Sequence, residues 1–154
     1  MTRAALDTPE AENLAKLCNL RKGTPLVAIH GGPGAAHESL LPLIDLHVKY
    51  SIPVIFYDQV GCGRSTRLRE KDRDEKFWTV DLFIKELDNL VDHLGLREAV
   101  YDIIDQSWGG MLGGVYAARK SVGLRKVILA DSPASIPLMM KGVQQSMKSL
   151  PEDV

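Results

Sequence analysis

Four short apolar runs, separated by longer amphipathic stretches, organise this sequence. The first run, at residues 26–29, does not alternate apolar with polar positions, which is typical of a strand buried on both faces of a parallel sheet. Further runs predict strands at residues 53–57, 100–104 and 124–130. The pattern therefore predicts a sheet of buried strands that are distant from one another in the sequence.

Between the strands, apolar residues recur at helical spacing. The clearest helix is predicted at residues 80–94, where they follow an i, i+3, i+4, i+7 pattern and Gly95 provides a C-terminal cap. Weaker patterns predict helices at residues 8–20, 37–50, 111–120 and 138–150, with Pro42 marking a kink or a false start in the second of these. Alternating strands and helices predict right-handed crossovers and an α/β fold, with a mainly parallel sheet covered by helices on both faces.

Composition places the chain among ordinary globular proteins and indicates no macromolecular partner. Its 154 residues and 45% hydrophobic content allow one domain with a core. A formal net charge of −1 gives no general attraction to nucleic acid or to a membrane surface, so we expect neither partner. Cys18 and Cys62 lack metal-finger spacing and the N-terminus has no apolar signal segment, so the expected location is the reducing cytoplasm.

The segment at residues 102–114, DIIDQSWGGMLGG, predicts a strand, a sharp turn at Ser107 and a helix. A serine on such a turn projects its hydroxyl above the sheet, and small residues beside it let strand and helix approach closely. The segment departs from the GxSxG pattern because Asp105 stands at the first glycine position. The alternative interpretation is that Ser107 merely caps the helix.

Two glycine-rich segments follow the first two predicted strands: HGGPG at residues 30–34 and DQVGCGRS at residues 58–65. Because the carboxyl ends of parallel strands lie at one edge of a sheet, these loops, the Ser107 turn and Asp131 are expected to meet on one rim. That rim is where a ligand would bind.

The loop at residues 58–65 has a second interpretation, as a dinucleotide-binding turn. The GxGxxG pattern fails, however, because Thr66 follows Gly61 and Gly63 where a third glycine is required. We expect instead that Asp58 and Arg64 brace the loop by hydrogen bonds and a local ion pair. The mixed-charge run at residues 67–76 is expected to be a solvated loop without chemistry.

Together these motifs resemble the proline iminopeptidases and related amino-acid amidases of the α/β-hydrolase fold. HGGPG, DQVGCGRS, QSWGGMLG at residues 106–113 and LADSPAS at residues 129–135 occur in the family's order. The resemblance covers roughly residues 24 to 150 and is poor over residues 1 to 23, where the family has an antiparallel hairpin. It implies a hydrolase without cofactor or metal, acting on the N-terminal proline or another N-terminal residue of a small peptide, or on an amino-acid amide.

The resemblance also implies roles for individual residues. Ser107 becomes the nucleophile that forms an acyl-enzyme, and the backbone N–H groups of Trp108 and Gly32 become the oxyanion hole. Gly31, Gly32 and Trp108 would contact the substrate. The supporting loop residues are His30, Pro33, Gly34, Asp58, Gln59, Gly61, Gly63, Ser65 and Asp105.

His30 and Asp105 differ from the other supporting residues in their expected roles. His30 is interpreted as structural rather than as the catalytic base, because in the family it belongs to the loop before the oxyanion hole. A carboxylate at Asp105 adds bulk at a close-packed position, and its charge opposes an oxyanion nearby, so we expect it to slow the reaction.

The family's order of serine, acid and histidine is not completed in this sequence. Histidines occur at positions 30, 37, 47 and 93, all before Ser107, whereas aspartates follow it at 131 and 153. We therefore expect a truncated α/β-hydrolase, inactive alone, in which the cap domain and the last strands are absent. The alternative is a non-catalytic binding or regulatory fragment of a longer hydrolase.

This expectation divides the chain into three parts: an N-terminal helical segment at residues 1–23, a partial α/β-hydrolase core at residues 24–135, and the start of a helical cap at residues 136–154. In such a chain the strand at residues 126–130 would expose an unpaired apolar edge. Self-association through that edge is expected.

Overall fold

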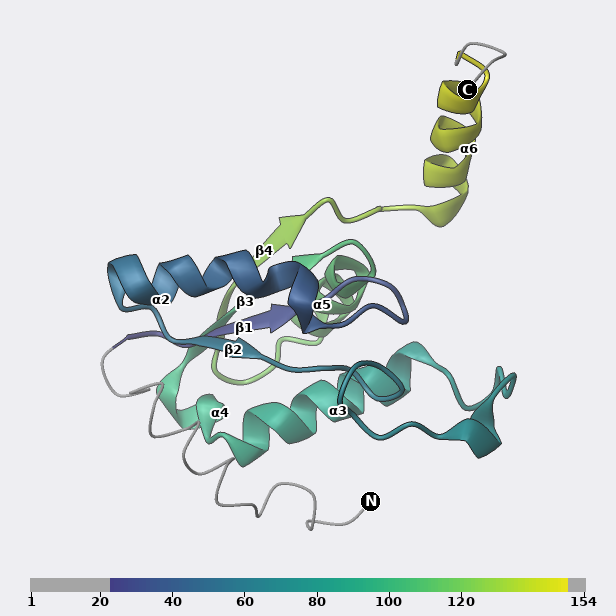
Figure 1. The fold of residues 1–154 in the computed structure, drawn as a ribbon. Coiled ribbons are helices and arrows are strands. Elements are labelled where there is room, and N and C mark those ends of the chain that lie inside the picture. Colours follow the sequence, from purple (N-terminus) through teal and green to yellow (C-terminus); the bar gives the residue numbers. More distant parts are fainter. Residues whose placement is uncertain (1–22, 150–154) are drawn as a thin grey trace.

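A four-stranded parallel sheet forms the centre of the molecule (Figure 1). The computed structural model describes residues 23–149. The strands are β1 (Leu26–Ile29), β2 (Val54–Phe56), β3 (Tyr101–Gln106) and β4 (Leu124–Ala130). Their order is β2-β1-β3-β4 and every neighbouring pair is parallel, so the predicted α/β class is confirmed.

The helices follow the apolar spacing of the sequence. The described elements are η2 (His37–Leu43), α2 (Ile44–Tyr50), η3 (Arg69–Lys71), α3 (Val80–His93), α4 (Leu96–Ala99), α5 (Trp108–Ala118) and α6 (Ile136–Met147). The predicted helix at residues 37–50 is a 3-10 turn containing Pro42 followed by an α-helix, as the position of the proline indicates. The short α4 was not predicted, and the helix predicted at residues 8–20 lies outside the described residues.

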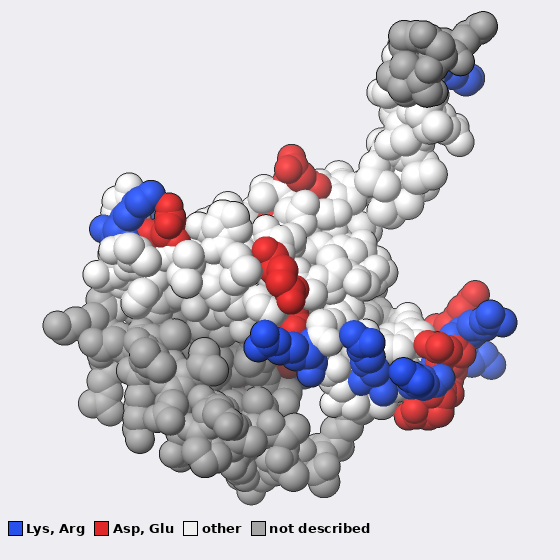
Figure 2. All heavy atoms as spheres, viewed as in Figure 1, with Lys and Arg blue, Asp and Glu red and all other residues white. Residues whose placement is uncertain are grey.

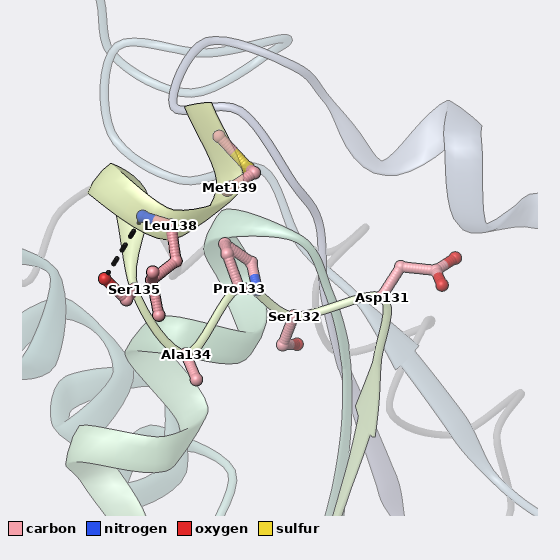
Figure 3. Close-up of a pocket in the computed structure, with 7 residues that line it drawn as sticks. All are labelled: Asp131, Ser132, Pro133, Ala134, Ser135, Leu138 and Met139. Carbon is pink, nitrogen blue, oxygen red and sulfur yellow. Dashed lines mark hydrogen bonds between the residues drawn. The ribbon is translucent and has the colours of Figure 1, made fainter. Parts of the chain in front are cut away.

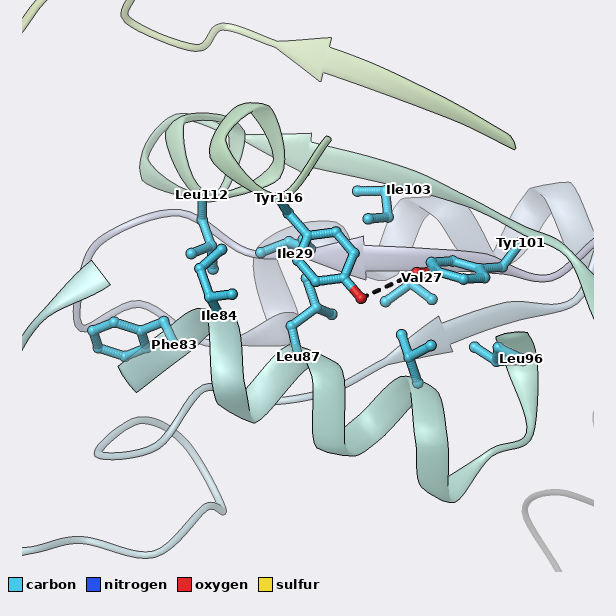
Figure 4. Close-up of a cluster of buried hydrophobic side chains, with 11 residues drawn as sticks. Val27, Ile29, Phe83, Ile84, Leu87, Leu96, Tyr101, Ile103, Leu112 and Tyr116 are labelled. Carbon is cyan, nitrogen blue, oxygen red and sulfur yellow. Dashed lines mark hydrogen bonds between the residues drawn. The ribbon is translucent and has the colours of Figure 1, made fainter. Parts of the chain in front are cut away.

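The strongest predicted helix, α3, is confirmed together with both of its ends. The Thr79 side chain accepts the N–H of Leu82, and Gly95 follows the helix in a left-handed conformation with φ 64°. Its buried face packs against the sheet beside α5, in a core that contains Val27 and Ile103 (Figure 4). Within this core the hydroxyls of Tyr101 and Tyr116 lie 3.1 Å apart, so these buried polar groups have a partner.

The opposite face of the sheet carries a smaller core. Leu26 and Ala28 of β1 point to this side, where Leu40 of η2 and Val54 of β2 complete the buried cluster. Because alternate residues of β1 enter different cores, the strand is buried on both faces, as its uninterrupted apolar run predicts. β1 and β3 are therefore the best-supported strands of the sheet.

The other end of the sheet is much less covered. Ile128 and Leu129 of β4 are 48% and 58% exposed, and α6 buries none of its residues. Figure 1 shows α6 standing away from the body of the protein. Within residues 23–149 no strand pairs with the outer side of β4, so the predicted exposed edge is confirmed.

The predicted solvated loop also has the expected surface. Figure 2 shows basic and acidic side chains mixed on the loop that carries η3, whereas the surface of α6 is mostly uncharged. Most residues from Arg67 to Lys76 are exposed. No helix among the described residues combines the length and apolar character needed to cross a membrane.

Candidate active site

Ser107 lies on a sharp turn between β3 and α5, at the carboxyl edge of the sheet. Its backbone angles are φ 56° and ψ −118°, which only a tightly constrained turn imposes on a non-glycine residue. The Ser107 N–H donates to Ala130 O at 3.0 Å, and the Gly110 N–H donates to Ser107 O at 3.0 Å. Ser107 occupies the N-cap position of α5, but its side chain forms no cap hydrogen bond, so the helix does not use the hydroxyl.

Glycine at position 109 allows α5 to start against the end of β1. A Cβ atom there would lie 2.5 Å from Ile29 O and 2.7 Å from His30 O, closer than real contacts allow. The first turn of the helix is therefore in contact with the strand that leads into the loop at residues 30–34. This approach brings the serine turn and the HGGPG loop together.

Asp105 fits into the fold because the facing helix lacks side chains at the same place. The residue is 1% exposed. A Cβ atom added to Gly110 would lie 2.7 Å from its Oδ1, and one added to Gly113 would lie closer still to its Oδ2. Ser132 Oγ donates to Oδ1 at 3.3 Å, and Oδ2 has no hydrogen-bond partner among the described residues. The bulk expected to crowd the turn is thus accommodated by α5. Burial raises the pKa of the carboxyl to about 6, against the opposing hydrogen bonds from Ser132 and Ala130.

Asp58 organises the loop after β2. Its carboxylate accepts the backbone N–H groups of His37 and Arg64, both at 2.9 Å, and lies 2.8 Å from the ring Nδ1 of His37. Burial favours a higher pKa, but these hydrogen bonds prevail and lower the pKa to about 2. Gly63, at φ 46°, leaves the space that the carboxylate fills, because a Cβ atom there would collide with it.

The expected bracing by Asp58 is confirmed, but the expected ion pair with Arg64 is wrong. Among the described residues the Arg64 guanidinium forms no salt bridge, and only its backbone N–H reaches Asp58. Ser65 also contributes, since its hydroxyl donates to Asp58 O. Hydrogen bonds to Asp58, rather than an ion pair with the Arg64 guanidinium, therefore hold the loop closed.

His37, Glu38 and Asp58 form a group whose potential ligand atoms lie within 4.8 Å of one another. Both carboxylate oxygens of Asp58 already accept hydrogen bonds, and His37 Nδ1 is directed at one of them. The group is therefore satisfied internally, and it serves as a loop brace rather than as a prepared cation site.

The HGGPG loop exposes its last three residues at the rim and buries His30 and Gly31. Gly32, Pro33 and Gly34 are exposed, and Gly32 has φ 124°, where a Cβ atom would strike Gly34 N. Gly31 is buried against the turn at Ser107. A Cβ atom added to Gly31 would lie 3.3 Å from Ser107 Cβ. Within residues 23–149 no hydrogen bond uses the backbone N–H of Gly32 or of Trp108. Neither N–H group is thus used by another described residue, and both belong to the residues where the sequence predicts an oxyanion hole.

The histidines near the rim are engaged in other contacts. His30 is fully buried; its Nε2 accepts the Gln59 N–H at 3.0 Å and its Nδ1 lies 2.8 Å from Gly31 O. This arrangement requires a neutral ring with the proton on Nδ1. His37 is paired with Asp58. His47 and His93 lie near the carboxyl ends of α2 and α3, which are at the opposite edge of the sheet from Ser107.

Sequence reasoning missed Glu86, which connects α3 to the loop at residues 58–65. Glu86 Oε1 accepts the Val60 N–H at 2.7 Å, while Oε2 and the Tyr57 hydroxyl are buried without a hydrogen-bond partner among the described residues. Burial raises the pKa of Glu86 to about 7, although the bond from Val60 opposes the shift. The only signal in the sequence was an acidic residue between Ile84 and Leu87, on an otherwise apolar helix face.

The rim continues beyond β4 as an open hollow of about 440 Å³ (Figure 3). It lies between the end of β4 and the first turn of α6, and Leu138 and Met139 give it an apolar wall. Ser132, which donates to Asp105, also lines it. Asp131 follows β4 directly, at the predicted edge of the sheet, and its carboxylate points away from the other lining side chains (Figure 3).

Known proteins share this sequence and fold over part of their length. A family model described as alpha/beta hydrolase fold matches residues 24–152. The chain is 39% identical over 132 residues to a proline iminopeptidase of Heyndrickxia coagulans, and the match covers 86% of this chain and 43% of that protein.

Two solved structures are also similar to this chain over part of their length. VinJ superposes with a TM-score of 0.81 at 43% identity, over 88% of this chain and 45% of that one. The proline iminopeptidase of Mycobacterium smegmatis superposes with a TM-score of 0.76 at 40% identity, over 83% of this chain and 42% of that one. The chain thus spans less than half the length of each of these three relatives.

Proposed function

Because the chain belongs to the alpha/beta-hydrolase fold family, we propose that it supplies the nucleophile and the oxyanion hole of a serine hydrolase. The observation that carries the proposal is the rim itself. Ser107 lies on a turn with positive φ, and its side chain forms no cap hydrogen bond. No described residue accepts the backbone N–H of Trp108, which follows Ser107, or that of Gly32, which follows the neighbouring Gly31. A nucleophile next to prepared donors is the arrangement that acyl transfer needs.

The proposed reaction is hydrolysis of an amide through an acyl-enzyme. Ser107 Oγ attacks the carbonyl carbon, and the carbonyl oxygen gains charge while it accepts the N–H groups of Trp108 and Gly32. The amine leaves with a proton, and water then releases the acyl group and regenerates the hydroxyl. The base that moves these protons is a separate requirement, because a serine hydroxyl is a weak nucleophile near neutral pH.

The proposed substrate is a small peptide with an N-terminal proline, or another N-terminal residue, and an amino-acid amide is the closest variant. Support comes from the two relatives named proline iminopeptidase above, which are 39% and 40% identical to this chain over the matched regions. The glycines at Gly31 and Gly32 support it further, because they let the backbone approach a bound carbonyl closely.

A second candidate function is binding without turnover, as a non-catalytic fragment of a longer hydrolase. The observation that favours it is the state of the histidines. None follows Ser107 in the sequence, His30 has both ring nitrogens in contacts, and His37 is bound to Asp58. On this interpretation the rim holds a ligand but no imidazole activates the serine.

Chemical rescue distinguishes the two candidates. A small alkyl fluorophosphonate is incubated with the 154-residue chain, with and without excess imidazole as an external base, and each serine is examined by peptide mass spectrometry. We expect Ser107 to be labelled faster than the other serines when imidazole is present, and Ser107→Ala to lose that label. Labelling of Ser107 no faster than that of exposed serines would contradict the nucleophile and favour binding alone.

A further inference from the structure

Gln59 is a buried amide located where the loops of the rim meet. It is 1% exposed, so each of its polar groups needs a partner inside the protein. Its backbone N–H donates to His30 Nε2 at 3.0 Å, and its side-chain Nε2 donates to His30 O at 2.9 Å. Its Oε1 accepts the indole N–H of Trp108 at 3.1 Å. One residue thus joins the HGGPG loop to the first residue of α5.

The chemistry of the partners fixes the orientation of this amide. An indole N–H can only donate and a backbone carbonyl can only accept, so Oε1 must face Trp108 and Nε2 must face His30. Glutamate at this position would place a second oxygen against the His30 carbonyl, and methionine would satisfy neither partner. The site therefore requires a donor and an acceptor on one side chain of this length.

The two partners of Gln59 are adjacent to the two proposed oxyanion donors. His30 precedes Gly31 and Gly32 in the loop, and Trp108 carries the other N–H itself. Neither donor N–H is held by a hydrogen bond among the described residues, so the separation of the two donors depends on what holds their neighbours. The Trp108 ring is supported on its other side by Phe83, with ring centroids 5.8 Å apart at 80°.

Resting on the function proposed above, the geometry points to Gln59 as a positioning residue for the oxyanion hole. It sets the HGGPG loop and the start of α5 at a fixed separation, without touching the substrate. Such positioning matters for rate, because a displacement of about 1 Å in a reacting geometry can cost about 100-fold.

The contact itself is tested by NMR on the 154-residue chain. The sequence has two tryptophans, and the Trp78 indole N–H donates to Lys71 O at 2.7 Å. In Gln59→Met we expect the Trp108 indole proton to shift upfield and to exchange faster with solvent, while the Trp78 signal stays in place. Unchanged exchange at Trp108 would overturn the inference.

The positioning role is tested by the imidazole-assisted phosphonylation described above. The measured quantity is the labelling rate of Ser107 relative to the other serines of the same molecule, compared only between variants that circular dichroism shows to be folded. We expect Gln59→Met and Gln59→Glu each to lower this ratio about tenfold, since both misplace oxyanion donors. Asn89→Asp, the same amide-to-acid change on the exposed side of α3, should leave the ratio unchanged.

A double substitution shows whether Gln59 acts through Trp108. Trp108→Phe keeps the packing on Phe83 but removes the indole donor, so it should lower the ratio in the same direction. Combined with Gln59→Met it should add little, because the two changes remove one shared contact. A folded Gln59→Met chain that keeps the wild-type ratio would refute the positioning role alone. Absence of any preference for Ser107 in the wild-type chain would instead refute the proposed function, and the positioning role with it.

Discussion

The two ends of the sheet differ in how much of the protein supports them. Around β1 and β3, the strands are covered on both faces, and glycines allow the loops of the rim to meet at Ser107. At the other end, β4 and α6 expose apolar side chains, including Leu129 at 58% and Leu138 at 70%. The proposed nucleophile and its donors therefore depend on well-packed elements, whereas the outer surface is apolar without a described partner. The predictions that follow test this contrast.

The largest expected effect is at Ser107. If the chain is joined to the C-terminal portion of the Heyndrickxia coagulans relative, beyond the region that it matches, we expect hydrolysis of proline p-nitroanilide. Ser107→Ala should abolish that activity, and the 154-residue chain alone should show none. Release of p-nitroaniline, followed by absorbance, is the measurement; turnover by the Ser107→Ala fusion would place the nucleophile elsewhere.

Gly109→Ala should destabilise the well-packed end by about 3 kcal/mol. The added Cβ would overlap the carbonyls of Ile29 and His30, which are backbone atoms in the centre of the sheet and cannot move freely. Gly114→Ala is the matched control on the same helix, since its Cβ would meet nothing within 4 Å. That variant should be neutral or more stable by up to about 1 kcal/mol, because alanine is the better helix former. Urea unfolding of both variants measures the difference, and equal stabilities would show that the close approach is not required.

Asp105→Asn should stabilise the protein at pH 8 by about 3 kcal/mol, and most of this gain should vanish near pH 4. The folded carboxyl keeps its proton up to about pH 6, whereas its ordinary pKa is 3.8. The folded state therefore binds the proton more tightly, and stability is lost as the pH rises from about 4 to about 6. Asp72→Asn, in the exposed loop, controls for the amide itself and should change stability by less than about 0.5 kcal/mol.

Unfolding of both variants by urea across this pH range is the measurement. A gain that is independent of pH would show that Asp105 is not titrating in its buried position. Asp105→Gly in the active fusion tests the separate expectation that this carboxylate slows the reaction, and equal activity of the two forms would refute it.

The smallest effect on stability is expected at β4. We propose that the chain self-associates through the free edge of this strand, and that Leu129→Glu weakens the association with a stability change below about 0.5 kcal/mol. Val48→Glu is the control, because Val48 is 72% exposed on α2, near the other edge of the sheet. Sedimentation velocity over a range of concentrations is the measurement. A wild-type chain that stays monomeric over the whole concentration range would contradict the proposed self-association.

The sequence predicts those features that depend on local patterns. The spacing from Val80 to Leu94 determines α3, and the uninterrupted run at residues 26–29 determines a strand buried on both faces. The turn at Ser107 follows from small residues placed next to a strand. All of these signals lie within one element or at its ends.

Features that depend on contacts between distant segments could not be read in the same way. Asp105 departs from the sequence pattern, and its fit depends on Gly110, Gly113 and Ser132, which lie around it only in the folded protein. The expected ion pair is wrong because Asp58 accepts the backbone N–H of Arg64 and not its guanidinium. The turn that places this N–H has a shape that the sequence does not specify. Glu86 lies on an apolar helix face, and only the fold brings it to Val60.

The pairing of β3 with β4 continues into the turn at Ser107. The Ser107 N–H donates to Ala130 O at the end of β4, so the least-covered strand helps to hold the backbone of the proposed nucleophile. Local opening of an edge strand exposes the amides that depend on it to solvent before the rest of the protein unfolds. Hydrogen exchange at the Ser107 amide therefore reports the opening of β4, and anything that covers that strand should slow the exchange at Ser107.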